Sequence, residues 1–468
     1  MNEKLSKELE QVLKEYDGEE KIKLNIKPEE LEKLIFTAGH RFLSFDFDLI
    51  KKLDLTGVSF ANVYVECCDF TGSYGVKINP QEVYNKSLYQ TVLKGVEIIG
   101  PFDGVNIERT NFTGSKGAVI NPQTVCGKNL KYSKLQNVTI EGSFNGVNIE
   151  RTDFTGSKGA VINPQTIYSE SLYRTVLKDT TIEGIFDDVC IQETNFAGSK
   201  GAVINPQTIY KRNLYRTILK DTKIIGSLDG VYIRCADFTG SKGAVINPQT
   251  VYDKNLNGTV LKDTEIKGSF DDVFIVETNF AGSKGAVINP QIIYDKKLNG
   301  TNLKDTIIEG SLDGTYIVAT NFTGSKGAVI NPQKIRFKSL SGTILKDTEI
   351  KGSFDEVYIE KTDFTGSKGA LIDPQIIRYK SLEYAILKDA ELKGSFNEVN
   401  IKGTDFTGSK GALMNLQTIR NGSLKDTTLN DVKIIDFSDC IETDVELNEY
   451  KKYISVKNEL QKKLIKKK

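Results

Sequence analysis

The chain has 468 residues, of which 39% are hydrophobic, and its 62 basic and 62 acidic side chains give a formal net charge of zero. Its longest apolar runs are a few residues, far short of the roughly 20 needed to cross a bilayer, and no apolar segment follows the opening MNEKLSKELE as a secretion signal would require. The composition therefore disfavours a membrane-spanning protein and a strongly basic nucleic-acid binder, and we expect a cytoplasmic protein.

Histidine and cysteine are too sparse for the common catalytic and metal sites. The only histidine is His40, and there is no tryptophan. Cysteine occurs six times without the spacing of a disulfide framework, at 67, 68, 126, 190, 235 and 440. One histidine cannot complete a Ser/His/acid or Cys/His arrangement. We predict no catalytic residues, no cofactor and no metal site, and hence a protein that is not an enzyme.

A 42-residue repeat dominates the chain. The proline of an NPQ motif recurs at 80, 122, 164, 206, 248, 290, 332 and 374, and Leu416 occupies the next equivalent position. One phenylalanine recurs with the same step: Phe70, Phe112, Phe154, Phe196, Phe238, Phe280, Phe322, Phe364 and Phe406. Such regularity predicts one structural unit repeated in space.

A period near 42 is compatible with HEAT or armadillo helices, WD40 blades or a β-solenoid, and the finer spacing separates them. Between Leu261 and Leu303 the large apolar residues follow one another at steps of 5, 4, 5, 5, 8, 5, 5 and 5. These steps match neither a helical stripe nor strand alternation, and the absence of tryptophan opposes WD40 blades. The pattern favours a squared coil of about twenty residues, two coils to each copy, with the extra length at GSKGAVI.

The stretch LDLTG-VSFAN-VYVEC-CDFTG (53–72), with central residues Leu55, Phe60, Val65 and Phe70, resembles the pentapeptide-repeat family. That resemblance implies an all-β fold, a right-handed quadrilateral β-helix. It would span residues 49–440 in about nine 42-residue copies, and the Phe residues above would form a column in its core.

A small residue is expected two positions before each large inward residue of such a coil. Before the phenylalanines this position holds Cys68, Thr110, Thr152, Thr194, Ala236, Thr278, Thr320, Thr362 and Thr404. Two sides of each copy depart from the rule, with Gln291 and Lys296 as examples. Because a buried unpaired charge is costly, we predict that INPQTIY and its equivalents bulge outward as loops or short helical turns.

The two ends differ from the repeats. Residues 1–48 are expected to form an N-terminal helical cap, and residues 441–468 a C-terminal helix with a basic tail. An arm that binds a partner remains an alternative for the first segment. A helix that mediates homodimerisation remains one for the second.

Repetition places charges in rows. Lysines recur at 116, 158, 200, 242, 284, 326, 368 and 410. Aspartates recur at 179, 221, 263, 305, 347 and 389, and again at 103, 187, 229, 271, 313 and 355. At about 10 Å between neighbours, repulsion is only about 0.4 kcal/mol in water. The rows are therefore either a solubilising surface or a periodic template for a partner, and Lys116, Lys158, Lys200, Lys242, Lys284, Lys326, Lys368 and Lys410 form the candidate interaction row.

Two functions follow from these features. The first is a non-catalytic, rod-shaped scaffold or protein-interaction module that presents charged rows to an unknown protein or polymer. The second, implied by the family resemblance, is a DNA-mimicking binder of a type II topoisomerase that protects or inhibits gyrase. Residues 51–440 carry 46 Lys/Arg and 45 Asp/Glu, so the acidic surface that mimicry requires is missing overall. We expect neither a membrane nor a nucleic acid as partner.

Overall fold

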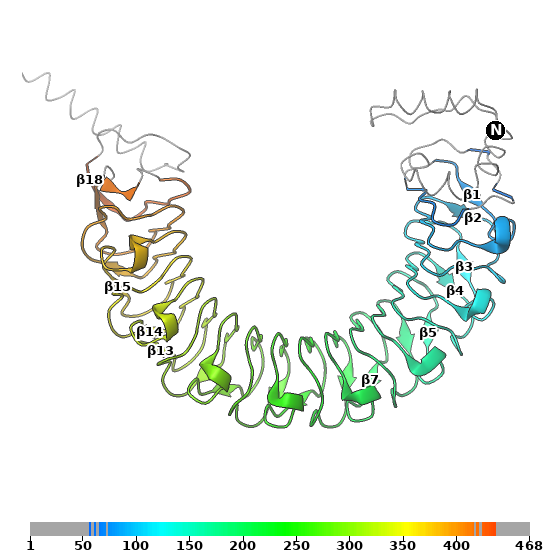
Figure 1. Ribbon diagram of the computed structural model, residues 1–468, viewed down its shortest axis with the longest axis horizontal. Coiled ribbons are helices and arrows are strands. Elements are labelled where there is room, and N and C mark those ends of the chain that lie inside the picture. Colours follow the sequence, from blue (N-terminus) through cyan, green and yellow to red (C-terminus); the bar gives the residue numbers. More distant parts are fainter. Residues whose placement is uncertain are drawn as a thin grey trace, which may run out of the picture. The chain divides into compact units, whose positions relative to one another are not determined.

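The computed structural model describes residues 56–57, 60–61, 65–71, 74–415, 418–420 and 424–436 (Figure 1). They belong to two compact units, Met1–Ala244 and Val245–Lys468. The expected terminal caps, 1–48 and 441–468, lie outside the described residues, as does His40.

Short parallel strands build an all-β solenoid in each unit, as the five-residue steps predict. Lys77 pairs with Glu97, twenty residues later, and Glu97 pairs with Lys116, nineteen residues later. On another side of the coil Val92 pairs with Asn111, nineteen residues on, and Asn111 with Lys134, twenty-three residues on. Each 42-residue copy therefore contains one shorter and one longer coil, and the described residues include no α-helix.

The paired strands are mostly two residues long, because each side of the coil turns a corner after about five residues. They are β1 (Lys77–Ile78), β2 (Glu97–Ile98), β3 (Val119–Ile120), β4 (Thr139–Ile140), β5 (Val161–Ile162), β6 (Thr181–Ile182), β7 (Val203–Ile204), β8 (Lys223–Ile224), β9 (Val245–Ile246), β10 (Glu265–Ile266), β11 (Val287–Ile288), β12 (Ile307–Ile308), β13 (Val329–Ile330), β14 (Glu349–Ile350), β15 (Leu371–Ile372), β16 (Glu391–Leu392), β17 (Leu413–Asn415) and β18 (Lys433–Asp436). Each odd-numbered strand pairs with the even-numbered strand that follows it.

The extra length of each copy lies where the eight-residue step predicts it. Lys116 pairs with Glu97, whereas the next strand on the same side begins three residues later, at Val119, and pairs with Thr139. The GSKG turn takes up this shift. Gly285 of one such turn has φ +78°, and an added Cβ would lie 2.7 Å from the Ile266 carbonyl oxygen of the preceding coil. Only glycine satisfies both conditions without strain.

The phenylalanine column forms the centre of the core. All nine of its rings, Phe70, Phe112, Phe154, Phe196, Phe238, Phe280, Phe322, Phe364 and Phe406, are buried, which confirms the prediction. Most contact a second buried ring ten residues earlier. Phe270 and Phe280, for example, lie 5.5 Å apart edge to face, the arrangement that aromatic quadrupoles favour.

The small residues before these rings also point inward, as predicted, and all nine are fully buried. Seven are threonines, and their hydroxyls reach across to another coil: Thr320 Oγ1 donates to the Leu298 carbonyl oxygen at 2.7 Å. A second set, which includes Thr343, donates to carbonyls 26 residues earlier. These hydrogen bonds satisfy hydroxyls that burial removes from water.

The NPQ segments form turns that lead into short 3-10 segments, in agreement with the predicted short helical turns, and side chains as well as proline hold them. Pro290 is buried. Gln291 Nε2 donates to the carbonyl oxygens of Ser311 and Asp313 in the next coil, at 2.7 and 2.8 Å. Lys296, half-buried, donates to Gln291 Oε1. The charged residue thus stays at the surface, and the glutamine amide satisfies backbone carbonyls of the neighbouring coil.

A short 3-10 segment follows each of the eight NPQ or DPQ turns, once in every second coil within each unit (Figure 1). These segments are η1 (Tyr84–Lys86), η2 (Cys126–Lys128), η3 (Tyr168–Glu170), η4 (Tyr210–Arg212), η5 (Tyr252–Lys254), η6 (Tyr294–Lys296), η7 (Arg336–Lys338) and η8 (Arg378–Lys380). Each contains two residues of positive φ, such as Asp295 at +48° and Lys296 at +47°. The charged side chains predicted to leave the coil do so here.

Candidate functional site

The candidate lysines lie on one side of the coils, which we call the lysine face. This face consists of strands β1–β16 and the eight row lysines, each paired through the backbone with the strand before it. All eight side chains, Lys116, Lys158, Lys200, Lys242, Lys284, Lys326, Lys368 and Lys410, are exposed. Within a unit the lysines therefore follow one another every second coil, about 10 Å apart at the usual strand spacing.

Acidic residues on the lysine face pair with other lysines. Glu97 lies beside Lys116 in the backbone ladder, yet its carboxylate contacts Lys77 at 3.1 Å. Glu265 likewise contacts Lys267 at 3.2 Å. Among the described residues, no ion pair within 4.0 Å involves any of the eight row lysines. Their charges are thus available to a partner.

Aliphatic side chains lie beside the row. The first strand of each copy presents an outward residue two coils before the lysine, and in most copies it is valine, such as Val119 and Val161. Both of these side chains are 41% exposed. After the first copy, which has Lys77 at this position, the lysine face therefore repeats an aliphatic residue and a cation, a pattern that a simple solubilising surface does not require.

The aspartates of the first acidic row have a structural role. Asp179 and Asp389 have φ of +67° and +68°, a conformation that aspartate tolerates better than most residues. Their carboxylates accept hydrogen bonds from the N–H groups of Gly156 and Gly366 in the preceding GSKG turns, each at 2.9 Å. These carboxylates hold the turns to the following coil.

The side chains of the second acidic row are exposed in most copies, and the row contacts the neighbouring coil through its backbone carbonyls. The backbone carbonyl of Asp271 accepts the Gln249 side-chain amide at 2.7 Å, while its carboxylate faces solvent. The Asp313 carboxylate forms an ion pair with the Lys334 ammonium at 3.3 Å. The backbone carbonyls of this row hold the NPQ turns in position through the glutamine side chains.

The GSKG turn is not built as a phosphate cradle. Its serine is buried in most copies, for example Ser115 and Ser157, and the following lysine belongs to the ladder of the lysine face. GSKG also lacks the GxxxxGK(S/T) spacing of a nucleotide-binding loop. Cys68 is similarly a core residue, and burial, followed by the neighbouring Cys67 and Glu66, raises the pKa of its thiol.

Sequence reasoning missed a second surface, formed by the β-turns one corner away from the lysine face. In the first unit these turns carry tyrosine and arginine. The Arg109 guanidinium lies 5.9 Å from the ring of Tyr89 and 4.8 Å from that of Tyr132, and Arg151 lies between Tyr132 and Tyr173 at 4.9 and 5.4 Å. A column-by-column comparison of the copies at these turns would have revealed the pattern.

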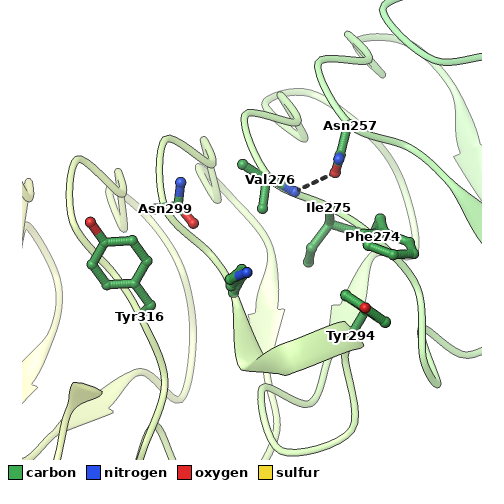
Figure 2. Close-up of a pocket in the computed structure, with 8 residues that line it drawn as sticks. Asn257, Phe274, Ile275, Val276, Tyr294, Asn299 and Tyr316 are labelled. Atoms are coloured by element: carbon green, nitrogen blue, oxygen red, sulfur yellow. Dashed lines mark hydrogen bonds between the residues drawn. The ribbon is translucent and has the colours of Figure 1, made fainter. Parts of the chain in front are cut away.

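In the second unit the same turns enclose a pocket of about 320 Å³ (Figure 2). It is lined by Asn257, Phe274, Ile275, Val276, Tyr294, Lys297, Asn299 and Tyr316. Phe274 and Tyr294 stack at one end, 3.7 Å between ring centroids, and Tyr316 stands at the other end. The volume is at the lower limit of small-ligand sites.

The polar side chains of this pocket are two asparagine amides and one lysine whose charge is paired with an aspartate. Asn257 Oδ1 accepts the Val276 N–H at 3.0 Å, which fixes the orientation of its amide. Asn299 Oδ1 is buried without a hydrogen-bond partner. The Lys297 ammonium contacts Asp295 at 2.7 Å, and hydrogen bonds from Lys297 and then Arg336 lower the pKa of the Asp295 carboxyl. The pocket is therefore close to neutral.

Within the described ranges, no group of three His, Cys, Asp or Glu side chains is placed to hold a metal ion. The same part of the chain contains no helix with the length and hydrophobicity of a membrane span.

Comparisons with known proteins give weak likenesses. No protein-family model and no curated protein matches the chain. Among solved structures it is similar to a trypsin-treated variant of QnrB1, a plasmid-mediated fluoroquinolone resistance protein, with 12% identity over 56% of this chain and 89% of that chain and a TM-score of 0.13. It is also similar to HetL, a pentapeptide repeat protein involved in heterocyst differentiation regulation from the cyanobacterium Nostoc, with 13% identity over 67% and 91% and a TM-score of 0.11.

Proposed function

We propose that the chain is a non-catalytic scaffold of the pentapeptide-repeat type, a right-handed, four-sided solenoid of about nine copies with helical caps. Its lysine face binds a cytoplasmic protein or polymer that carries acidic groups at a repeat near 10 Å. The observation that supports this proposal is that each of the eight row lysines is exposed, is paired through the backbone with the strand before it, and makes no ion pair among the described residues.

The valines beside the row strengthen the proposal. A surface needed only for solubility would gain nothing from aliphatic groups at the surface beside most of its cations, whereas an interface combines apolar contact with charge complementarity. DNA mimicry needs a continuous acidic surface. The lysine face presents the opposite charge, so the scaffold explains the geometry better than a topoisomerase binder does.

The test is affinity capture with three proteins. In the first variant all eight row lysines are changed to glutamate. In the control, six exposed lysines outside the row are changed in the same way: Lys178, Lys220, Lys262, Lys304, Lys346 and Lys388. We expect a partner captured by the wild type and the control to be lost from the row variant, and its binding to weaken as salt is raised.

Equal capture by all three proteins would reject the lysine face as the contact. A gyrase supercoiling assay at high protein excess addresses the alternative. Inhibition or protection that survives replacement of the row would favour a topoisomerase binder over the scaffold.

A further inference from the structure

The pocket in the second unit exists because short side chains replace long ones at equivalent positions of the repeat. Asn257 and Asn299 are the first residues of their turns. Two copies earlier, 84 residues along the chain, the same positions hold Tyr173 and Tyr215. The backbone path is the same, because the turn N–H of Gly300 donates to the next coil just as that of Arg216 does.

The second residue of these turns shows the same contrast. It is glycine at 258 and 300, but Arg174 and Arg216 two copies earlier, where positive φ of +57° and +53° disfavours any side chain. In the first unit, therefore, large planar groups cover this corner in spite of backbone strain. At Gly258 and Gly300, beside the pocket, these covering groups are absent, although Tyr384 occupies the equivalent position further along the second unit.

The covering groups show what the space accepts. The Tyr215 ring stacks on Tyr232 with centroids 5.7 Å apart and 16° between planes. Position 232 is equivalent to Phe274 and Tyr316, which line the pocket. The aromatic walls thus remain in the second unit, while the ring that would lie against them has been replaced by an asparagine amide.

The two asparagine amides indicate which polar groups a ligand of the pocket must carry. Asn299 Oδ1 offers an acceptor that lacks a partner within the described structure, on the side facing Val276 (Figure 2). Asn257 holds its oxygen on the Val276 N–H, which leaves its Nδ2 as a donor. One donor and one acceptor beside an aromatic slot match a peptide group next to an aromatic side chain.

We propose that this pocket binds an extended peptide segment of a partner protein, through one tyrosine or phenylalanine side chain. The ring enters between the stacked Phe274 and Tyr294 on one side and Tyr316 on the other. The adjoining peptide N–H donates to Asn299, and the peptide carbonyl accepts from Asn257. An anionic ligand is disfavoured because Asp295 already compensates Lys297. This inference is independent of the lysine face.

The variant Asn299→Tyr tests the proposal by restoring, from within the chain, the ring found at Tyr173 and Tyr215. The coil tolerates tyrosine at this position, so the variant is expected to fold. Ser341→Tyr, one copy further along at the equivalent position and outside the pocket, is the matched control. Circular dichroism and thermal unfolding of both variants establish that the solenoid is intact.

The probes are N-acetyl-tyrosine N-methylamide, its alanine counterpart, N-acetylglucosamine and uridine, each measured by saturation-transfer NMR on the full chain. We expect the tyrosine probe to bind the wild type and Ser341→Tyr alike. It should bind at least about tenfold better than the alanine probe, because ring burial supplies the affinity. Asn299→Tyr should lose that binding.

A random-peptide library selected on the wild type and counter-selected on Asn299→Tyr gives a second readout. We expect an aromatic residue enriched at one fixed position. Failure of the tyrosine probe to bind, equal binding by Asn299→Tyr, preference for the sugar or the nucleoside, or selected peptides without an enriched aromatic residue would each overturn the proposal.

Discussion

Replacing Phe280 with alanine removes a buried ring from the column on which the core depends. Phe280 has no exposed surface, and its edge-to-face partner Phe270 is buried beside it. A phenylalanine ring that leaves a cavity in a packed core costs about 3–5 kcal/mol of the free energy of unfolding. Because solenoid coils contact only their neighbours, the loss should stay local.

Hydrogen exchange measured by mass spectrometry is the suitable assay. At 1.4 kcal/mol per factor of ten, exchange of the amides in the adjoining coils should accelerate by about two to three and a half orders of magnitude. These amides include that of Phe280, which donates to the Asn302 carbonyl, and that of Asn302, which donates to the Thr278 carbonyl. Coils several turns away should exchange at the wild-type rate.

Phe270→Leu is the control, because leucine occupies the equivalent positions Leu228 and Leu312 and is buried there. This change should cost under about 1.5 kcal/mol. Acceleration below tenfold for Phe280→Ala, or equal acceleration throughout the second unit, would refute a core organised as stacked, locally stabilised coils.

Three further changes test other parts of the structure. Thr320→Val removes a buried hydroxyl that bonds to another coil and should lower the free energy of unfolding by about 0.5–1.5 kcal/mol in denaturant titrations, with no effect counting against the hydroxyl ladder. Gly285→Ala should lower the melting temperature more than Gly282→Ala: both glycines have positive φ, but only at Gly285 does the added Cβ meet a backbone oxygen at 2.7 Å. The Asp295 carboxyl, whose folded pKa is lowered, contributes stability that is present above its unfolded pKa of about 4 and is lost as the pH falls through the folded value. An NMR titration should show this pKa rising in Lys297→Met, and an unchanged value would contradict the ion pair.

The rows of charge that look equivalent in the sequence differ in the structure. Asp179 and its equivalents have positive φ, and several of their carboxylates bond to glycine N–H groups, so they belong to the scaffold. The lysines of the row have exposed side chains, and their main chain alone takes part in the ladder. Duplication therefore yields both structural and available charges, and hydrogen-bond partners distinguish them.

The core could be predicted from the sequence because its rule is local. A step of five residues brings each large residue to the inside of the next side of the coil. The position of Phe280 holds a large residue, and that of Thr278 a small one, in every copy. The short helical turn at Lys296 could also be predicted, since a charge cannot occupy an inward position. The extra residues at GSKG locate the lengthening of one coil in two.

The tertiary structure decided which side chains meet across coils. Residues 257, 276 and 299 come together because successive coils are offset by nineteen and twenty-three residues, a register set by backbone pairing and not by any local motif. Whether a turn side chain stacks on its neighbour or leaves a pocket depends on residues in adjacent coils. The single chain therefore specifies its inward residues copy by copy, whereas its surfaces arise only when the coils are stacked.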